Sequence, residues 1–285
     1  MDTAVVACCQ LAPSLGQDAA NRELAAAAVA TAAAQGAAVV VLPELVSSGY
    51  VFESRAEARA SAEPPDGPTV TGWERLAADL GVVIVGGFCE LAGDGVFNSA
   101  ALVDPAGLRC VYRKAHLWDA ERLWFAAGDA APPVVPTELG RIGVMICYDL
   151  EFPEWVRLPA LAGAQLLCAP VNWPAAPHPP GERPAEIVRV QADAGVNRMF
   201  IAVADRVGTE RGVDWVGGSM IADPDGWLLA GGAPSAEPVT ILAECRLYDA
   251  LSKAVSQFSN VHADRRPELY GPVAGSGGAL VHDEQ

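Results

Sequence analysis

The chain has 285 residues, of which 51% are hydrophobic and 19% are charged, and its formal net charge is −16. This length without a low-complexity linker favours one domain over residues 1–270, followed by a tail at 271–285. The acidic charge argues against nucleic acids and anionic membranes as partners. No apolar run reaches the roughly 18 residues of a membrane span, so we expect a cytoplasmic protein that acts on a small molecule.

Apolar runs and helix-like stretches alternate along the chain. In chain order, the runs that predict strands are 4–9, 38–42, 82–89, 99–103, 109–112, 142–146, 166–169, 200–204, 218–222 and 239–243. Helices are predicted over 18–35, 69–80, 153–162 and 184–197. Asp18 or Asn21 is expected to cap the first helix. Many strands are apolar on both faces, which favours an α/β fold of two mixed sheets packed face to face, each covered by helices.

Glu44 follows the strand predicted at 38–42, after a proline. If its carboxylate is buried, its pKa rises and the group becomes a plausible general base near neutral pH. The alternative is an exposed loop carboxylate.

Lys114 follows the strand predicted at 109–112. A lysine near a carbonyl substrate can donate to a developing oxyanion, and its charge favours thiolate over thiol. The alternative is a solvated lysine at a strand end.

Cys147 follows the apolar run 142–146 and precedes a predicted helix that begins near Pro153. A thiol at the carboxyl end of a strand is a candidate nucleophile. The alternative is a buried cysteine that packs as a small hydrophobic residue. Together, Glu44, Lys114 and Cys147 would supply the base, the oxyanion donor and the nucleophile of an acyl-transfer reaction.

The proline-rich segment 170–184 directly follows the strand predicted at 166–169 and carries Trp173. It cannot form regular structure, so we expect a loop that lines the site, with a rigid surface connection as the alternative.

Seven cysteines and four histidines are spread along the chain. The odd number of cysteines and the absence of a C-x-x-C pair favour reduced thiols in a reducing compartment. No histidine and cysteine pair has zinc-finger spacing, so we expect no metal and no cofactor.

Three segments in this order, Leu42-Pro43-Glu44, Tyr112-Arg113-Lys114 and Cys147-Tyr148-Asp149, resemble the nitrilase superfamily of carbon–nitrogen hydrolases. The resemblance runs from about residue 3 to residue 270. It also includes similar flanking segments at 121–128, 218–226 and 265–270.

The resemblance implies an α-β-β-α sandwich and a mechanism without a cofactor. Cys147 would form a thioester, while Glu44 would take the thiol proton, pass it to the leaving amine and then activate water. Lys114 and the backbone N–H of Tyr148 would bind the oxyanion. Glu121 would position substrate or water; the alternative is a helix-surface glutamate paired with Arg122. The family commonly forms homodimers or larger homo-oligomers.

The residues after Cys147 bear on the substrate. Nitrilases proper tend to show Cys-Trp-Glu, whereas Cys147-Tyr148-Asp149 resembles the amidase and carbamoylase branches. The ω-amidase branch typically has arginine where this chain has Glu151, which argues against a dicarboxylic acid monoamide. Glu151 could favour neutral or cationic amides, or it could form a structural ion pair.

Aromatic residues near the three strand ends are candidates for the walls of a substrate pocket. The alternative is that they are core or interface side chains. The candidate substrate-binding residues are Tyr50, Trp118, Tyr148, Asn172 and Trp173.

We therefore expect an amidase that releases ammonia from a small linear carboxamide. The alternatives are an N-carbamoyl-amino-acid hydrolase, a nitrilase, and a non-catalytic binding or redox protein on the same fold. A cysteine–histidine hydrolase that uses His116 also stays open, although no acidic partner for His116 is evident in the sequence.

Overall fold

The computed structural model describes residues 3–275, in two compact units, Met1–Ser252 and Lys253–Gln285. The first unit contains two six-stranded sheets with helices on both sides. The second is described over residues 253–275 and contains a short hairpin, a 3₁₀ turn and a short helix. The predicted division at residue 270 falls inside this second unit, and most of the predicted tail, residues 276–285, lies outside the described residues.

The first sheet has the strand order β14-β1-β2-β3-β4-β5. Strands β1, β2 and β3 are mutually parallel, whereas β14, β4 and β5 join as antiparallel neighbours. The bounds are β1 (Ala4–Gln10), β2 (Val39–Val41), β3 (Val83–Ala92), β4 (Gly95–Asp104), β5 (Gly107–Arg113) and β14 (Val239–Cys245).

The second sheet has the order β13-β12-β9-β8-β7-β6. Strands β7, β8 and β9 are parallel, so their carboxyl ends lie at one edge. The bounds are β6 (Val134–Thr137), β7 (Gly140–Val144), β8 (Leu166–Pro170), β9 (Phe200–Ala204), β12 (Met220–Ala222) and β13 (Leu228–Gly231).

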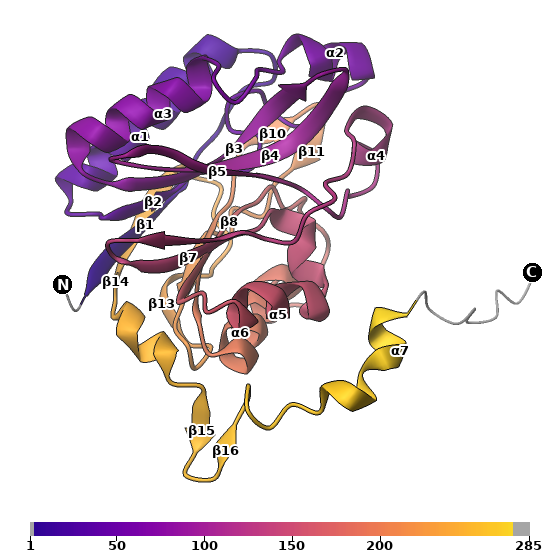
Figure 1. Cartoon of the computed structure of the whole chain (residues 1–285). Helices are drawn as coiled ribbons and strands as arrows, with labels where there is room; N and C mark the ends of the chain where they lie inside the picture. The colour runs from indigo at the N-terminus through magenta and orange to yellow at the C-terminus, as the bar shows by residue number, and fades with distance from the viewer. Residues whose placement is uncertain (1–2, 276–285) are drawn as a thin grey trace, which may run out of the picture. The chain divides into compact units, whose positions relative to one another are not determined.

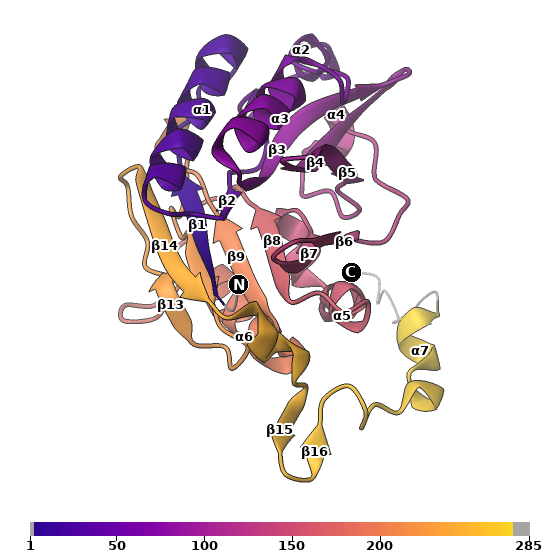
Figure 2. The ribbon, with the colours of Figure 1, turned by 60° about the vertical axis from the view of Figure 1, so that its left-hand side comes forward.

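Helices cover the outer face of each sheet. Helices α1 (Asp18–Ala34) and α3 (Pro68–Leu80) pack on the first sheet, and α5 (Pro153–Leu161) and α6 (Ala185–Asn197) lie on the second (Figures 1 and 2). The predicted sandwich of two mixed sheets between helical layers is confirmed.

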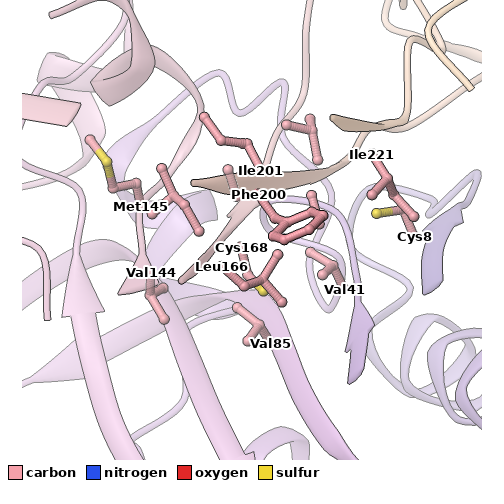
Figure 3. Close-up of a cluster of buried hydrophobic side chains, with 14 of the residues drawn as sticks. Cys8, Val41, Val85, Val144, Met145, Leu166, Cys168, Phe200, Ile201 and Ile221 are labelled. Atoms are coloured by element: carbon pink, nitrogen blue, oxygen red, sulfur yellow. The ribbon is translucent and has the colours of Figure 1, made fainter. Parts of the chain in front are cut away.

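The core between the sheets follows from strand alternation. In β1, Cys8 faces the second sheet, while its neighbour Cys9 faces the helical layer. Figure 3 shows Val41 and Val85 of the first sheet beside Cys168 of the second. Because both faces of the central strands are covered, these strands are apolar throughout, as parallel strands buried on both sides require.

Shorter elements complete the chain. These are α2 (Arg55–Ala60), α4 (Glu121–Trp124), η1 (Cys147–Glu151), β10 (Thr209–Glu210), β11 (Val213–Asp214), η2 (Leu247–Leu251), β15 (Ala254–Ser256), β16 (Ser259–Asn260), η3 (Pro267–Leu269) and α7 (Gly271–Ala274). No helix among the described residues is both long and apolar enough to cross a bilayer.

The predicted capping of α1 is wrong. Gln17 occupies the N-cap position, and no side chain caps the helix. Asn21 instead accepts a hydrogen bond from the Ser14 N–H at 2.8 Å and donates to the Ser14 oxygen at 2.7 Å. Its amide therefore stabilises the turn before the helix. A short polar side chain can bond to the nearby backbone in this way in place of capping a helix.

Candidate active site

Glu44 lies just beyond β2, at the edge where the first sheet meets the second. Its side chain is fully buried. The neighbouring strand β3 passes very close: a Cβ on Gly87 would lie 2.4 Å from the Leu45 nitrogen and 2.6 Å from the Glu44 Cα. Leu45 itself has a φ of 47°, in the left-handed region. The backbone at Glu44 is therefore held by close packing and by a sharp turn.

Lys114 follows the last residue of β5 and is also fully buried. Its N–H donates to the Asn98 oxygen on β4 at 2.9 Å. Its own carbonyl accepts from the Gly128 N–H at 2.8 Å. These contacts on both sides of the backbone fix the point from which the ammonium extends.

A lysine and two carboxylates form a buried ion cluster. The Lys114 Nζ lies 2.7 Å from Glu44 Oε1 and 2.7 Å from Glu121 Oε1. Asn98 Nδ2 donates to Glu44 Oε1 at 2.7 Å, and the Tyr50 hydroxyl donates to Glu121 Oε1 at 2.5 Å. Burial makes such a cluster costly unless every charge is paired and hydrogen-bonded, and this condition is largely met here.

Glu121 is therefore not a helix-surface residue. It is only 4% exposed, and its second oxygen accepts from the Trp118 N–H at 3.0 Å. Arg122 donates instead to the Leu117 carbonyl. The alternative pairing of Glu121 with Arg122 is excluded by these contacts.

Cys147 begins the 3₁₀ turn η1, three residues after β7 ends. Its φ is 46°, which is uncommon for a residue with a side chain. Asp149 stabilises this turn: Oδ2 accepts from the Ile146 N–H at 3.3 Å and from the Tyr112 hydroxyl at 2.7 Å. The strained conformation at Cys147 is thus held by a buried carboxylate two residues later.

The loop after β8 joins the nucleophile to the ion cluster. The Cys147 thiol contacts the Asn172 carbonyl oxygen at 3.8 Å, and Asn172 Nδ2 donates to the Glu44 carbonyl at 2.9 Å. Asp205 accepts from the Trp173 N–H at 3.0 Å and thereby anchors the next residue. The site-lining loop expected at 170–184 is present at its start.

A small cavity of about 40 Å³ opens beside Cys147. Four of the five candidate substrate-binding residues line it, whereas Tyr50 does not, because its hydroxyl is bound to Glu121. The lining residues are Trp118, Cys147, Tyr148, Glu151, Asn172, Trp173, Pro174 and Glu186.

Burial and charge shift the pKa values in the site. Burial raises the pKa of Glu44 to about 7, although the Lys114 charge opposes this shift. Burial lowers the pKa of Lys114, but the charges of Glu121 and Glu44 outweigh burial and hold that pKa well above its ordinary value. Burial, followed by the Glu44 charge, raises the pKa of the Cys147 thiol. Lys114 favours the thiolate, as expected, but it does not prevail, so the thiol needs a base.

His116 has an acidic partner that was not evident in the sequence. Its Nδ1 lies 2.7 Å from Asp149 Oδ1, and its ring stacks on Phe152 with centroids 3.9 Å apart. The imidazole is not among the residues that line the cavity beside Cys147. This arrangement gives His116 a role in the turn after the nucleophile and does not favour a cysteine–histidine pair.

Glu151 forms an ion pair with Arg189 of α6, as the structural alternative anticipated. It nevertheless lines the cavity. Burial raises its pKa, and Arg189 opposes that shift.

Four residues with a direct role in the geometry were missed from sequence: Asn98, Asp149, Glu186 and Asp205. Asn98 lies within β4 next to Ser99, and polar residues inside a strand carry no distinctive signal. Asp205 directly follows β9, so the reasoning applied to Glu44 and Lys114 would have found it. Within the described range, no three His, Cys, Asp or Glu side chains lie together in a way that could hold a metal ion.

Comparison with known proteins gives concordant results. Residues 5–251 match the family model of carbon-nitrogen hydrolases. A protein named nitrilase from Pyrococcus abyssi is 37% identical over 93% of this chain and 98% of its own length. An N-carbamoylputrescine amidase from Arabidopsis thaliana is 33% identical over 85% of this chain and 86% of its own.

A solved structure of an amidase mutant from Nesterenkonia sp. has a TM-score of 0.76 at 26% identity, covering 94% of this chain and 95% of that one. It carries the acetamide moiety of fluoroacetamide covalently added at its active-site cysteine. The family model spans nearly all of the first unit, including the ion cluster and the turn at Cys147. The chain belongs to the carbon–nitrogen hydrolases of the nitrilase superfamily, on its amidase-like branch.

Proposed function

We propose that the protein is an amidase that hydrolyses a small carboxamide to a carboxylic acid and ammonia through a thioester on Cys147. The observation that carries the proposal is the buried Glu44–Lys114–Glu121 cluster beside a thiol that lines a cavity. A base, a cationic donor and a nucleophile in one site are what acyl transfer needs.

Glu44 is the proposed base. Its Oε1 is engaged by Lys114 and Asn98, whereas its Oε2 is buried and has no hydrogen-bond partner among the described residues. A pKa of about 7 lets this oxygen accept a proton at neutral pH and return it in the next step. In the proposed cycle, Oε2 receives the thiol proton while the sulfur attacks the carbonyl carbon.

Lys114 is the proposed oxyanion donor. An ammonium has three N–H groups, and two of those on Lys114 point to the two carboxylates, which leaves one for the substrate oxygen. The Tyr148 backbone N–H, next to the nucleophile, is the proposed second donor. The tetrahedral intermediate then collapses to the thioester as Glu44 protonates the departing ammonia.

Hydrolysis of the thioester completes the cycle. Glu44, again ionised, takes a proton from water as the water attacks the acyl carbon, and the thiol of Cys147 leaves protonated. Glu121, fixed by Tyr50 and Trp118, is proposed to orient the substrate or this water.

The polarity of Asn172 favours an amide over a nitrile. Its Nδ2 is committed to the Glu44 carbonyl, so its Oδ1 must be an acceptor. That oxygen is buried, has no hydrogen-bond partner among the described residues, and belongs to a residue that lines the cavity. A carboxamide NH₂ can donate to it, whereas a nitrile nitrogen cannot.

The decisive experiment is an ammonia-release assay over amides, N-carbamoyl amino acids and nitriles, with Cys147→Ala and Cys147→Ser as controls. We expect release from amides by the wild type and none by either variant, while circular dichroism shows that both variants fold. Turnover by a homogeneous Cys147→Ala protein would refute the assignment. Faster turnover of carbamoyl amino acids would favour the carbamoylase alternative, which the similarity to an N-carbamoylputrescine amidase also raises.

We also propose that the protein forms a homodimer or larger homo-oligomer. The second unit exposes large apolar side chains: Phe258 is 87% exposed and Leu269 is 61% exposed. Surfaces of this kind are typical of segments that pack against another chain. Sedimentation should give a dimer or larger species, and Phe258→Ser should shift it toward the monomer; a wild-type monomer at micromolar concentration would contradict the proposal.

A further inference from the structure

The two charged side chains that line the cavity, Glu151 and Glu186, have the same sign. Among the described residues, no lysine, arginine or histidine lines it. The unpartnered Oδ1 of Asn172, which is 1% exposed as a residue, adds a neutral acceptor to the same wall. A ligand that fills this cavity therefore meets acceptors, and an anionic group on it would be repelled.

The two carboxylates differ in how they are compensated. Glu151 is paired with Arg189. Glu186 is the second residue of α6 and is half-buried, and no ion pair or hydrogen bond to its carboxylate is found among the described residues. Its charge is near enough to Glu151 to raise the pKa of that carboxyl. Of the two cavity carboxylates, Glu186 is thus the one whose negative charge is available to pair with a ligand.

A structural role for Glu186 exists but does not account for its place in the cavity. An acidic residue in the first turn of a helix interacts favourably with the helix dipole. Glu154 has the same position in α5, yet it is exposed and does not line the cavity. Glu154 and Glu186 both lie in the first turn of a helix, but only Glu186 also lines the cavity.

The remaining walls suit a cation. Trp118 and Tyr148 meet edge to face with ring centroids 4.9 Å apart, and Trp173 lines the same space. Aromatic faces attract alkylammonium groups through their quadrupoles. The net charge of −16 adds a long-range attraction for cationic substrates.

We propose that the natural substrate is a short amide whose acyl group ends in a protonated amine, and that Glu186 is the residue that selects it. This inference rests on the proposed amidase function. A hydrogen bond between charged groups in a partly buried site corresponds to about 10- to 100-fold in affinity, which sets the size of the expected preference.

The test compares matched amides. Each ω-aminoalkanamide, with two to five methylenes, is paired with the neutral alkanamide in which a methyl group replaces the ammonium group. The wild type should show kcat/KM at least about 10-fold higher for the cationic member at the best chain length. A monoamide with a terminal carboxylate should be the poorest substrate.

Variants of Glu186, with one control, distinguish a role in substrate selection from a role in stabilising α6. Glu186→Gln should reduce the preference, measured as the ratio of kcat/KM for the cationic and the neutral amide, by about 10-fold. Glu186→Lys should reverse the preference toward the carboxylate-bearing amide. Glu154→Gln is the matched control: it removes an equivalent first-turn charge and should leave the preference intact.

The outcomes are distinct. If wild-type enzyme hydrolyses neutral and cationic amides equally well, or if Glu186→Gln keeps the full preference, the inference is wrong while the amidase function stands. If no amide of any charge is hydrolysed, the proposed function itself fails.

Discussion

At the scale of single residues, the site depends on one carboxylate that is difficult to ionise. Glu44 is deprived of water, and the neighbouring Lys114 charge only partly compensates, so its pKa settles at about 7. A carboxylate with an ordinary pKa would be a much weaker base toward a thiol whose own pKa is raised. Burial thus gives Glu44 the raised pKa that its proposed role as a base requires, and the Lys114 charge offsets part of the cost of burying the carboxylate.

The pH dependence of the reaction should report this group. Because the proposed base Glu44 would have to be ionised to accept the thiol proton, kcat/KM for a neutral amide should rise with pH through a midpoint of about 7. The midpoint belongs to the coupled cluster of Glu44, Lys114 and Glu121. An acidic limb centred near the ordinary value of 4.5 would contradict this assignment. Glu44→Gln should lower kcat by about 10²–10⁴-fold at every pH.

At the scale of elements, strand ends place the groups and close backbone packing fixes them. Glu44 and Lys114 extend from the first sheet, and Cys147 and Asn172 follow strands of the second. Gly87 on β3 is one of the supporting contacts, since a Cβ there would meet the backbone at Glu44 and Leu45.

Gly87→Ala should therefore displace the base. A methyl group 2.4 Å from the Leu45 nitrogen forces the backbone after β2 to shift, and shifts of this kind near reacting groups cost about 10²-fold in rate. We expect kcat to fall by about that factor, measured by ammonia release on protein shown to be folded by circular dichroism. Gly72→Ala on α3 is the control, because its Cβ meets nothing within 4 Å. Unchanged kcat in Gly87→Ala would show that the contact does not position the base.

Local sequence patterns were enough to predict much of the fold and part of the candidate active site. The ten predicted strands and four predicted helices all occur, with ends shifted by a few residues, because apolar runs bounded by glycine and proline are strong signals. Strand β6 (Val134–Thr137) was missed because it is short and contains a proline.

Long-range pairings were not predictable. Strand β14 pairs with β1 across more than two hundred residues, and no local pattern specifies that partner. Asn98 and Glu186 were missed for the same reason: each lies at the candidate site only because another segment folds against it. Glu44, Lys114 and Cys147 were found because a strand precedes each one.

At the scale of the whole molecule, several buried carboxyls share one effect on stability. Burial raises the pKa of Asp193 and of Asp205 to about 7, as it does for Glu44. Unfolding returns each pKa to its ordinary value of about 4, so between these values the folded state binds more protons than the unfolded state. The stability that these groups contribute is complete below about pH 4 and is lost as pH rises through about 7.

The free energy of unfolding should therefore decrease as the pH rises from about 5 to about 8, measured by urea denaturation. Self-repulsion in a chain of net charge −16 acts in the same direction. Asp205→Asn should flatten part of this slope. It should also cost about 1–3 kcal/mol at pH 5, because an amide cannot accept all three backbone N–H groups that Asp205 accepts, from Trp173, Arg206 and Gly218. A stability that rises over this pH range would contradict the assignment.

The division of the site between two sheets has a consequence during synthesis of the chain. The segments that supply Glu44 and Lys114 emerge from the ribosome before Cys147 exists, and the thiol arrives on a sheet that must still dock. Until the interface of Figure 3 has formed, the thiol has no base beside it. The architecture thus couples the proposed chemistry to the finished fold: an incomplete chain carries the Cys147 thiol without the base and the cationic donor that are proposed to act on it.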